Sequence, residues 1–283
     1  MKEALYFKSS DGNVECGLCP HNCKIADGKK GRCGVRVNRG GRLYSEIYNR
    51  ATSIALDPIE KKPLYHYHRG EYILSIGTKG CNLTCPWCQN WTISQDLDTP
   101  TREVSTEAII DKAKKVGSFG IAYTYNEPFI WYEFVLECCG KAKKSGLENV
   151  FVTNGYINSE PFKEILPYIG AMNVDVKSIE ESFYVKYCLG RLQPVLDNII
   201  TAKQGGVHIE ITNLVIPGLN DSEDCFTRLA DWVADNLGED TPLHFSRYFP
   251  CFKMTSAPTP VSTLSLAKEI AKRKLKYVYL GNV

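Results

Sequence analysis

Three cysteines in a short loop carry the most specific chemical signal in this sequence. Cys81, Cys85 and Cys88 are separated by three and then two residues, and they follow the apolar run 73–76. A cubane four-iron, four-sulfur cluster is normally held by four cysteines, so three leave one iron free to bind something other than protein. A tetrahedral zinc site would need a fourth ligand from elsewhere, because the loop contains no His and the next cysteine is Cys138. The spacing therefore indicates an iron–sulfur cluster with one open coordination position.

A simpler interpretation of the same residues is a redox dithiol formed by Cys85 and Cys88. Pro86 disfavours helix at the residue before it. The third cysteine, Cys81, the neighbouring glycines and the lack of a helical pattern after Cys88 also fit a dithiol poorly. Unliganded thiols are the remaining alternative for this loop.

The pattern CxxxCxxC, with the aromatic residue Trp87 before the last cysteine, resembles the signature of the radical S-adenosylmethionine (SAM) family. The resemblance implies that the open iron binds the amino and carboxylate groups of SAM. It also implies that an electron from the reduced cluster cleaves the C–S bond of SAM, which yields methionine and a 5′-deoxyadenosyl radical. Direct coordination fixes the geometry that electron transfer to the sulfonium requires.

Shorter motifs elsewhere in the chain narrow this resemblance. Five segments are similar to the pyruvate formate-lyase activating enzyme group: 77–82, 88–90, 125–128, 153–155 and 175–177. Three more make the chain most similar to the AmmeMemoRadiSam system radical SAM enzyme: 19–21, 57–66 and 245–247. The resemblance covers nearly the whole chain, and the cysteine triplet is its most specific part.

Composition limits the classes of protein to which the chain can belong. It has 283 residues and a formal net charge of +2, so its charge predicts no binding to nucleic acid or to an acidic membrane surface. No apolar run approaches the roughly 18 residues of a membrane span, and the N-terminus lacks a long apolar segment. We therefore expect a cytoplasmic protein with one large core, or with one core and a small appendage.

The use of cysteine favours a reducing compartment. Of the twelve cysteines, seven fall in two groups with metal-like spacing, whereas disulfides would be expected only in a secreted chain. The other five are expected to be ordinary buried thiols: Cys138, Cys139, Cys188, Cys225 and Cys251.

The chain divides into two parts of different composition. Residues 1–69 form a small Cys-rich N-terminal extension, whereas strands and helices alternate through 70–283. The expected strands are 73–77, 120–125, 149–153, 171–176, 207–216, 243–247 and 277–280. The expected helices are 106–116, 129–144, 160–168, 194–204, 221–236 and 261–272. This alternation predicts parallel strands joined by right-handed crossovers, and six βα units predict a partial (β/α)6 barrel of the TIM type.

Polar residues alternate with apolar ones along three of the expected strands. Side chains of a strand alternate between its faces, and the apolar set should face the outer helices. The polar set should then face inward: Asn173, Asp175, Lys177, His208, Glu210, Thr212, His244 and Ser246. Such a lumen cannot be a dry core, because unpaired buried charge is costly. It either holds a polar, charged ligand such as SAM or is satisfied by internal pairs, for example between Asp175 and Lys177.

Ligands of parallel α/β folds bind at the C-terminal ends of the strands, where several polar residues of this chain are expected. By resemblance, Asn126 and Glu127 lie in the segment that contacts the amino group of SAM, and Asp175 and Lys177 contact its methionyl and ribose parts. Trp87 corresponds to a position that often touches the adenine. Two further cofactor candidates are Asn154, after the third strand, and His244, on the sixth. The simplest alternatives are a helix N-terminal acid for Glu127 and a turn residue for Asn154.

Four cysteines near the N-terminus form a second group of metal-like spacing: Cys16, Cys19, Cys23 and Cys33. Together with nearby turn-forming glycines they could close an all-thiolate zinc site, with His21 as a substitute ligand. The spacing also resembles the cluster-binding segment of molybdopterin oxidoreductases, in which four cysteines hold a second cubane. Zinc here would be structural, a cluster could supply electrons to the radical site, and free thiols are the third interpretation.

One main functional hypothesis and two alternatives follow. We expect a radical SAM enzyme that cleaves SAM and abstracts a hydrogen atom from a substrate that the sequence does not identify. The resemblance implies SAM and a reductant such as ferredoxin or flavodoxin as partners, and functional association with Memo-type and AMMECR-type proteins. One alternative is an activase of a glycyl-radical enzyme, which acts on a backbone glycine of another protein. The other is a non-catalytic iron–sulfur carrier.

Overall fold

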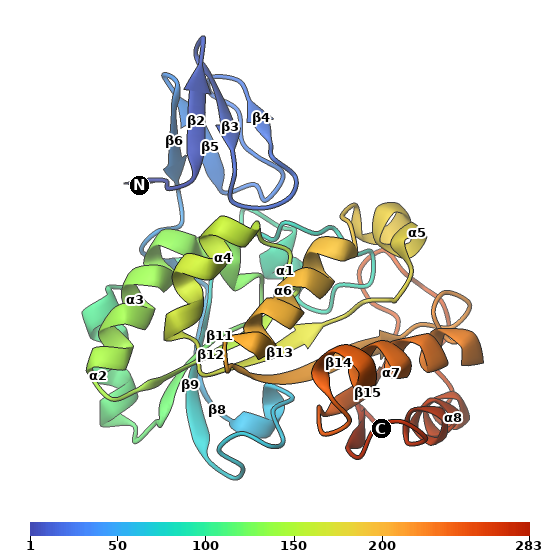
Figure 1. The fold of residues 1–283 in the computed structure, drawn as a ribbon. Helices are drawn as coiled ribbons and strands as arrows, with labels where there is room; N and C mark the ends of the chain where they lie inside the picture. Colours follow the sequence, from blue (N-terminus) through green and yellow to red (C-terminus); the bar gives the residue numbers. More distant parts are fainter.

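A computed structural model describes residues 1–283, and its main feature is an open sheet of eight strands (Figure 1). Seven strands are parallel and follow one another across the sheet in chain order: β9 (Tyr72–Gly77), β11 (Gly120–Tyr123), β12 (Glu148–Thr153), β13 (Ala171–Asp175), β14 (His208–Val215), β15 (Leu243–Arg247) and β16 (Val278–Gly281). The two edge strands do not pair with each other. The alternation of strands and helices along the sequence therefore produces the expected partial barrel.

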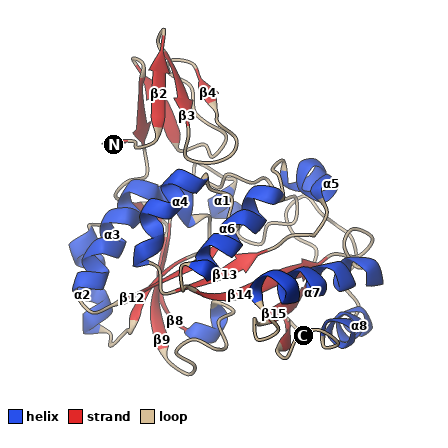
Figure 2. Cartoon of the chain, in the orientation of Figure 1, coloured by secondary structure: helices blue, strands red, loops and turns tan.

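Six long helices connect the parallel strands, and Figure 2 shows them along the outer side of the sheet. They are α2 (Thr106–Lys115), α3 (Tyr132–Lys144), α4 (Ser159–Ile165), α6 (Gln193–Gln204), α7 (Glu223–Leu237) and α8 (Val261–Ala271). In α7 the buried residues Phe226, Leu229 and Val233 recur at helical spacing and form one apolar face. The Ser222 hydroxyl caps this helix by accepting from the amide of Cys225. All six helices were expected, but α7 begins after Ser222 rather than at residue 221.

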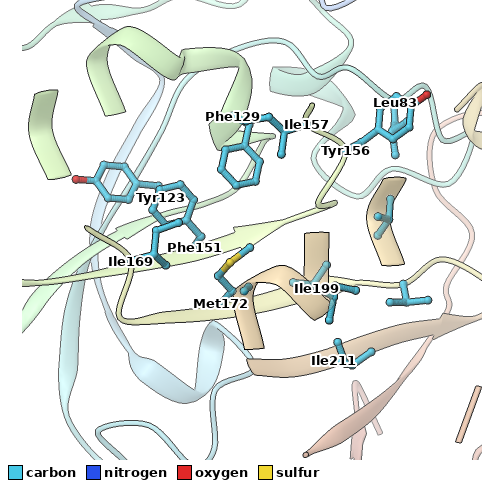
Figure 3. Close-up of a cluster of buried hydrophobic side chains, with 14 of the residues drawn as sticks. Leu83, Tyr123, Phe129, Phe151, Tyr156, Ile157, Ile169, Met172, Ile199 and Ile211 are labelled. Atoms are coloured by element: carbon cyan, nitrogen blue, oxygen red, sulfur yellow. The ribbon is translucent and has the colours of Figure 1, made fainter. Parts of the chain in front are cut away.

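The core lies between the sheet and these helices. Its largest cluster contains 66 buried residues, and Figure 3 shows part of it. Met172 of β13 and Ile211 of β14 lie on neighbouring strands, and Ile199 belongs to α6. All three side chains are buried. The apolar residues of the strands are therefore packed against the outer helices, as the alternating pattern predicted.

An eighth strand, β8 (Ser53–Pro58), pairs antiparallel with β9 at one edge of the sheet. Its pairing runs from Ser53 opposite Gly77 to Pro58 opposite Tyr72. Proline is compatible with an edge strand, because it has no amide to donate to a second neighbour. Residues 53–58 were expected to be part of the N-terminal extension. The first strand of the large sheet therefore precedes the boundary that we expected between residues 69 and 70.

The N-terminal residues fold into two small antiparallel sheets that stand above the large one (Figure 1). One consists of β1 (Lys2–Glu3), β6 (Arg42–Ser45) and β5 (Arg36–Arg39), and the other of β2 (Phe7–Ser10), β3 (Asn13–Cys16) and β4 (Lys24–Ile25). Two further strands, β7 (Arg50–Ala51) and β10 (Arg102–Glu103), pair antiparallel and form a separate two-stranded sheet. Arg36 and Glu133 of α3 form a buried ion pair of 2.9 Å. This pair joins the extension to the body of the protein.

Short helical segments complete the fold: η1 (Ile59–Lys61), α1 (Trp91–Ser94), η2 (Pro128–Trp131), η3 (Leu166–Tyr168), α5 (Glu181–Phe183) and η4 (Tyr184–Cys188). The last of these is a π-helical turn, a rare conformation that is frequent at functional sites. None of the helices combines the length and apolarity that crossing a membrane requires.

Candidate active site

A cavity of about 380 Å³ lies at the C-terminal ends of the parallel strands. This volume falls in the range of small-molecule sites. The cavity contains all but one of the cofactor-site residues predicted from the sequence: Cys81, Cys85, Trp87, Cys88, Asn126, Glu127, Asn154, Asp175 and Lys177. The parallel sheet explains this convergence, because successive strands deliver their C-terminal ends to one edge.

The three cysteines of the loop after β9 all contribute to the cavity wall. The Sγ of Cys81 accepts from the amide of Leu83 (3.4 Å) and from the Nδ2 of Asn154 (3.7 Å). The Sγ of Cys88 lies 3.1 Å from the Oγ of Ser94. Burial raises the pKa of Cys81 and that of Cys88. Hydrogen-bond donors that could stabilise a thiolate therefore lie beside the Sγ atoms of Cys81 and Cys88.

The donor set of this loop fits an iron–sulfur cluster better than a single ion. No three His, Cys, Asp or Glu side chains in the structure converge on one point as the ligands of one metal ion do. Cluster ligands need not converge in this way, because each thiolate binds a different iron. Three thiols around one cavity are thus compatible with three corners of a cubane.

Cys188 of η4 lies behind Cys85, and the two Sγ atoms are 3.8 Å apart. Their hydrogen bond lowers the pKa of Cys85 and raises that of Cys188. Cys188 is buried and does not line the cavity. Cys188 therefore stands outside the set of thiols that face the cavity.

Asn126 and Asn154 anchor the cysteine loop to the ends of β11 and β12. The Nδ2 of Asn126 donates to the carbonyl of Gly80 (2.9 Å), and its Oδ1 accepts from the amide of Thr78 (3.1 Å). The Nδ2 of Asn154 donates to the Oδ1 of Asn82 (2.9 Å). Both residues face the cavity, but their amide groups already serve the loop.

Glu127 is a buried carboxylate whose hydrogen bonds join η2 to the end of β12. It accepts from the amide of Phe129 (3.0 Å), the hydroxyl of Thr153 (2.7 Å) and the amide of Asn154 (2.8 Å). Burial raises the pKa of Glu127 to about 7 despite these hydrogen bonds. The carboxylate is therefore both a cap of η2, as the alternative interpretation held, and a member of the cavity wall.

Asp175 and Lys177, at the end of β13, form an ion pair of 2.7 Å within the cavity wall. Burial opposes the charge of Lys177, but Asp175 and the thiol of Cys85 outweigh it and raise the pKa of the lysine. The internal pair considered as an alternative therefore exists, and it coexists with the cavity.

Trp87 is 3% exposed and packs against Phe183, with ring centroids 5.3 Å apart.

His244 is the one predicted residue of the cofactor site that does not line the cavity. Its Nε2 lies 2.6 Å from the carboxylate of Glu210, and its ring contacts those of Tyr65 and Tyr279. Glu210 also bonds the ring of His208 at 3.0 Å. The inward polar residues thus divide into a cavity-lining set at the strand ends and a self-satisfied layer deeper in the sheet.

Of the four N-terminal cysteines, Cys33 lies beside the cysteine loop through its backbone. Gly80 of the loop has φ +90°, and an added Cβ would lie 2.6 Å from the carbonyl of Cys33. Burial raises the pKa of Cys16, and it raises that of Cys33 to about 11. Zinc requires donors around one point, and no group of three is arranged in this way. A structural zinc, a second cluster and free thiols nevertheless stay the three interpretations of these cysteines.

Two cysteines that we expected to be ordinary buried thiols lie beside the loop. Cys188 contacts Cys85, and the Sγ of Cys251 is 3.5 Å from the carbonyl of Cys88. Nothing in their local sequence signals this, because the contacts join segments more than 100 residues apart. Cys138 and Cys139 are buried in α3, as expected.

Comparison with known proteins assigns the family. The chain matches the Radical SAM superfamily over residues 75–230, from β9 into α7. An uncharacterized protein of Methanocaldococcus jannaschii, MJ0808, is 44% identical over 100% of this chain and 86% of that protein. A pyruvate formate-lyase-activating enzyme of Clostridium pasteurianum is 23% identical over 55% of this chain and 66% of its own length.

Solved structures support the same fold. A radical SAM methyltransferase from Sphaerobacter thermophilus superposes with a TM-score of 0.58 at 11% sequence identity, over 76% of this chain and 67% of that chain. Its similarity concerns the arrangement of the sheet and helices. Because the family match covers more than half of the chain, the cysteine loop included, we conclude that the protein belongs to the Radical SAM superfamily.

Proposed function

We propose that the protein binds a four-iron, four-sulfur cluster through Cys81, Cys85 and Cys88 and cleaves SAM reductively. The observation that carries the proposal is the donor set: three thiols line one cavity, and no fourth cysteine lines it. The bound cluster and SAM would supply the electron and the sulfonium from which a 5′-deoxyadenosyl radical forms. That radical would abstract hydrogen from a substrate that is not yet identified.

The cavity residues would bind and orient SAM. A carboxylate has about four acceptor positions, and Glu127 uses three of them within the protein. The fourth position is suited to the ammonium group of SAM. Asp175 is partly exposed at the wall and would accept from ribose hydroxyls. Trp87 would form an apolar wall for the adenine.

Lys177 would favour reduction of the cluster. Its ammonium interacts electrostatically with the thiol of Cys85. Reduction adds a negative charge to the cluster, and a nearby cation in a site of low dielectric stabilises that charge. Its partner Asp175 holds the ammonium in place at 2.7 Å.

Anaerobic reconstitution tests this proposal directly. The wild type should bind at least about four irons per chain, change its EPR spectrum when SAM is added, and release 5′-deoxyadenosine after reduction. Cys85→Ala should lose iron and activity together. Cys138→Ala is the matched control, because it removes a buried thiol of α3 outside the site, and it should retain both. Wild-type cluster without any response to SAM would leave only the electron-carrier function.

A glycyl-radical activase is the second candidate, because a relative is named a pyruvate formate-lyase-activating enzyme. Incubation with a glycyl-radical enzyme of the host would then produce the EPR doublet of a backbone glycyl radical. The relative MJ0808, which matches over the whole of this chain, is uncharacterized, so it favours neither candidate. Functional association with Memo-type and AMMECR-type proteins, as in the AmmeMemoRadiSam system, belongs to the first candidate, and co-purification from the host tests it.

The remaining parts of the proposal concern the setting of the enzyme. We propose a cytoplasmic location and a protein reductant of the ferredoxin or flavodoxin type. The N-terminal cysteines Cys16, Cys19, Cys23 and Cys33 are proposed as a second metal site, for zinc or for an iron–sulfur cluster, with free thiols as the alternative. Iron and zinc quantification on a Cys16→Ala/Cys19→Ala variant beside the wild type distinguishes these states, because a second cluster would lower the iron content, a bound zinc would lower the zinc content, and free thiols would lower neither.

A further inference from the structure

A basic cleft lies between the N-terminal extension and the segment after η4. Its volume is about 500 Å³, and its charged lining residues are all cations: Lys24, Lys30, Arg32 and Arg191. Lys30 forms an ion pair of 2.6 Å with Glu46. The other three make no ion pair, and no carboxylate lines the cleft. The cleft therefore presents positive charge that the protein itself does not compensate.

This cleft lies close to a predicted cluster ligand. One of its wall residues, Leu189, directly follows Cys188, whose Sγ is 3.8 Å from the Sγ of Cys85. The Nη1 of Arg32 donates to the carbonyl of Leu189 (2.9 Å) and fixes the wall in place. An electron that moves from the cleft wall to the cysteine loop would therefore cross one peptide unit and one sulfur–sulfur contact.

The cleft and the active-site cavity share no lining residue. On the cleft side, the ring of His21 lies 2.7 Å from the carbonyl of Asn82 in the cysteine loop. The cavity would hold SAM and substrate, so an electron carrier could not use its mouth while they are bound. Cys85 is only 8% exposed. A carrier must therefore deliver its electron through a short stretch of protein, and the wall of the cleft provides one.

Leu189 also gives the cleft an apolar element. Its side chain is 47% exposed, and its φ of +54° lies in the left-handed region, which is unusual for a bulky residue. An exposed apolar residue beside several cations resembles the organisation of interfaces, in which an apolar centre has a polar rim. Electron-transfer interfaces are small and transient, and their charges steer association.

We propose that this cleft docks a protein one-electron carrier with an acidic surface, which reduces the cluster through the Cys188–Cys85 contact. The inference rests on the proposed function, since it requires the cluster. One electron leaves the reduced centre of the carrier, which becomes oxidised, and the same electron reduces the cluster. No proton is transferred, and no bond is formed or broken. A small anion is the competing occupant of the cleft.

Stopped-flow absorbance on the reconstituted protein tests the proposal, with an acidic ferredoxin, reduced in advance, as the probe. Lys24→Glu/Arg191→Glu reverses the charge of two cations that lie outside the active-site cavity. Electrostatic steering raises association rates by about 10-fold to 1,000-fold. We therefore expect the second-order rate of cluster reduction to fall by at least about 10-fold in this variant. The wild-type rate should fall as salt is added, and the variant rate should not.

Two controls distinguish a loss of docking from a general effect of charge reversal or a defect in the cluster. Lys272→Glu/Arg273→Glu reverses charge in another basic surface, at the end of α8, and should leave the rate unchanged. Reduced methyl viologen, a small cation, should reduce the cluster of all three proteins equally.

The outcomes are distinguishable. A ferredoxin rate that is equal in the wild type and in Lys24→Glu/Arg191→Glu, that is independent of salt, or that falls equally in the α8 control overturns the inference, and a small anion is then the better occupant. Absence of any reducible cluster in the wild type refutes the proposed function instead.

Discussion

The buried carboxylate of Glu210 allows a direct test of how the polar interior of the sheet is stabilised. It lies on β14 with no exposed surface. It accepts from the rings of His244 (2.6 Å) and His208 (3.0 Å) and from the amide of His66 (2.8 Å). In Glu210→Gln, an amide nitrogen replaces one acceptor oxygen and faces a donor. The variant keeps the shape of the side chain and removes its charge.

The magnitude follows from the pKa of the carboxyl group. Burial raises this pKa, but the hydrogen bonds from His208 and His244 outweigh burial and lower it from 4.5 to about 2. This difference corresponds to about 3 kcal/mol of stability at neutral pH. Because the folded pKa is below the unfolded one, the stabilisation is present above about pH 4.5 and is lost as the pH falls toward 2. Between about pH 5 and pH 3 the loss amounts to about 2 kcal/mol.

Urea unfolding of the cluster-free wild type and of Glu210→Gln, measured across this pH range, checks the prediction. At pH 7 the free energy of unfolding of the variant should be lower by about 3 kcal/mol. The difference between the two proteins should shrink by about 2 kcal/mol as the pH falls to 3. Glu148→Gln is the control, because this exposed carboxylate accepts one bond from Tyr67 and should cost less than about 1 kcal/mol. Parallel pH profiles of the wild type and Glu210→Gln, or a difference below about 1 kcal/mol at pH 7, would refute the reasoning.

Three further predictions concern the cysteine loop and its surroundings. Burial raises the pKa of Glu127 to about 7. The contribution of Glu127 to the free energy of unfolding is therefore present below about pH 4.5 and is lost as the pH rises through 7. The stability of the wild type relative to Glu127→Gln should therefore fall by up to about 3 kcal/mol from pH 5 to pH 8 in urea unfolding, and a constant difference contradicts this. Cys188→Ala removes the thiol that lies 3.8 Å from the Sγ of Cys85 and that would donate to a cluster-bound Cys85 thiolate, so it should lower the midpoint potential of the cluster by about 20–40 mV at unchanged iron content. An EPR-monitored titration that shows equal potentials contradicts it. Gly80→Ala places a methyl group 2.6 Å from the carbonyl of Cys33 at a φ of +90° and should cost about 2–3 kcal/mol. A thermal unfolding midpoint equal to that of the wild type would exclude the contact.

Much of the fold and most of the candidate site could be predicted from the sequence, because both depend on local signals. Alternating strand and helix patterns led to the seven parallel strands and six long helices. Parallel strands bring their C-terminal ends to one edge, so residues as distant as Cys81 and Lys177 could be placed in one cavity. The antiparallel β8 was missed, because an edge strand that ends in Pro58 carries a weak pattern of its own.

The contacts that could not be predicted join residues far apart in the chain. The partner of His244 is Glu210, 34 residues away, and not a ligand in the cavity. The partner of Cys85 is Cys188, 103 residues away. Strand alternation predicts which face a side chain occupies. It does not predict at what depth of the sheet a buried charge finds a hydrogen-bond partner, and that depth separates the inner polar layer from the cavity wall.

The sequence by itself determined the family of this protein, because three thiols at this spacing in one loop are the most specific part of its match to the Radical SAM superfamily. Only the tertiary structure decided what surrounds that loop. Gly80 contacts the extension at Cys33, η4 brings Cys188 to Cys85, and a basic cleft lies on the far side of that contact. The physical reason is that spacing along the chain limits only neighbours, whereas packing of the sheet, helices and extension sets the distances between remote side chains.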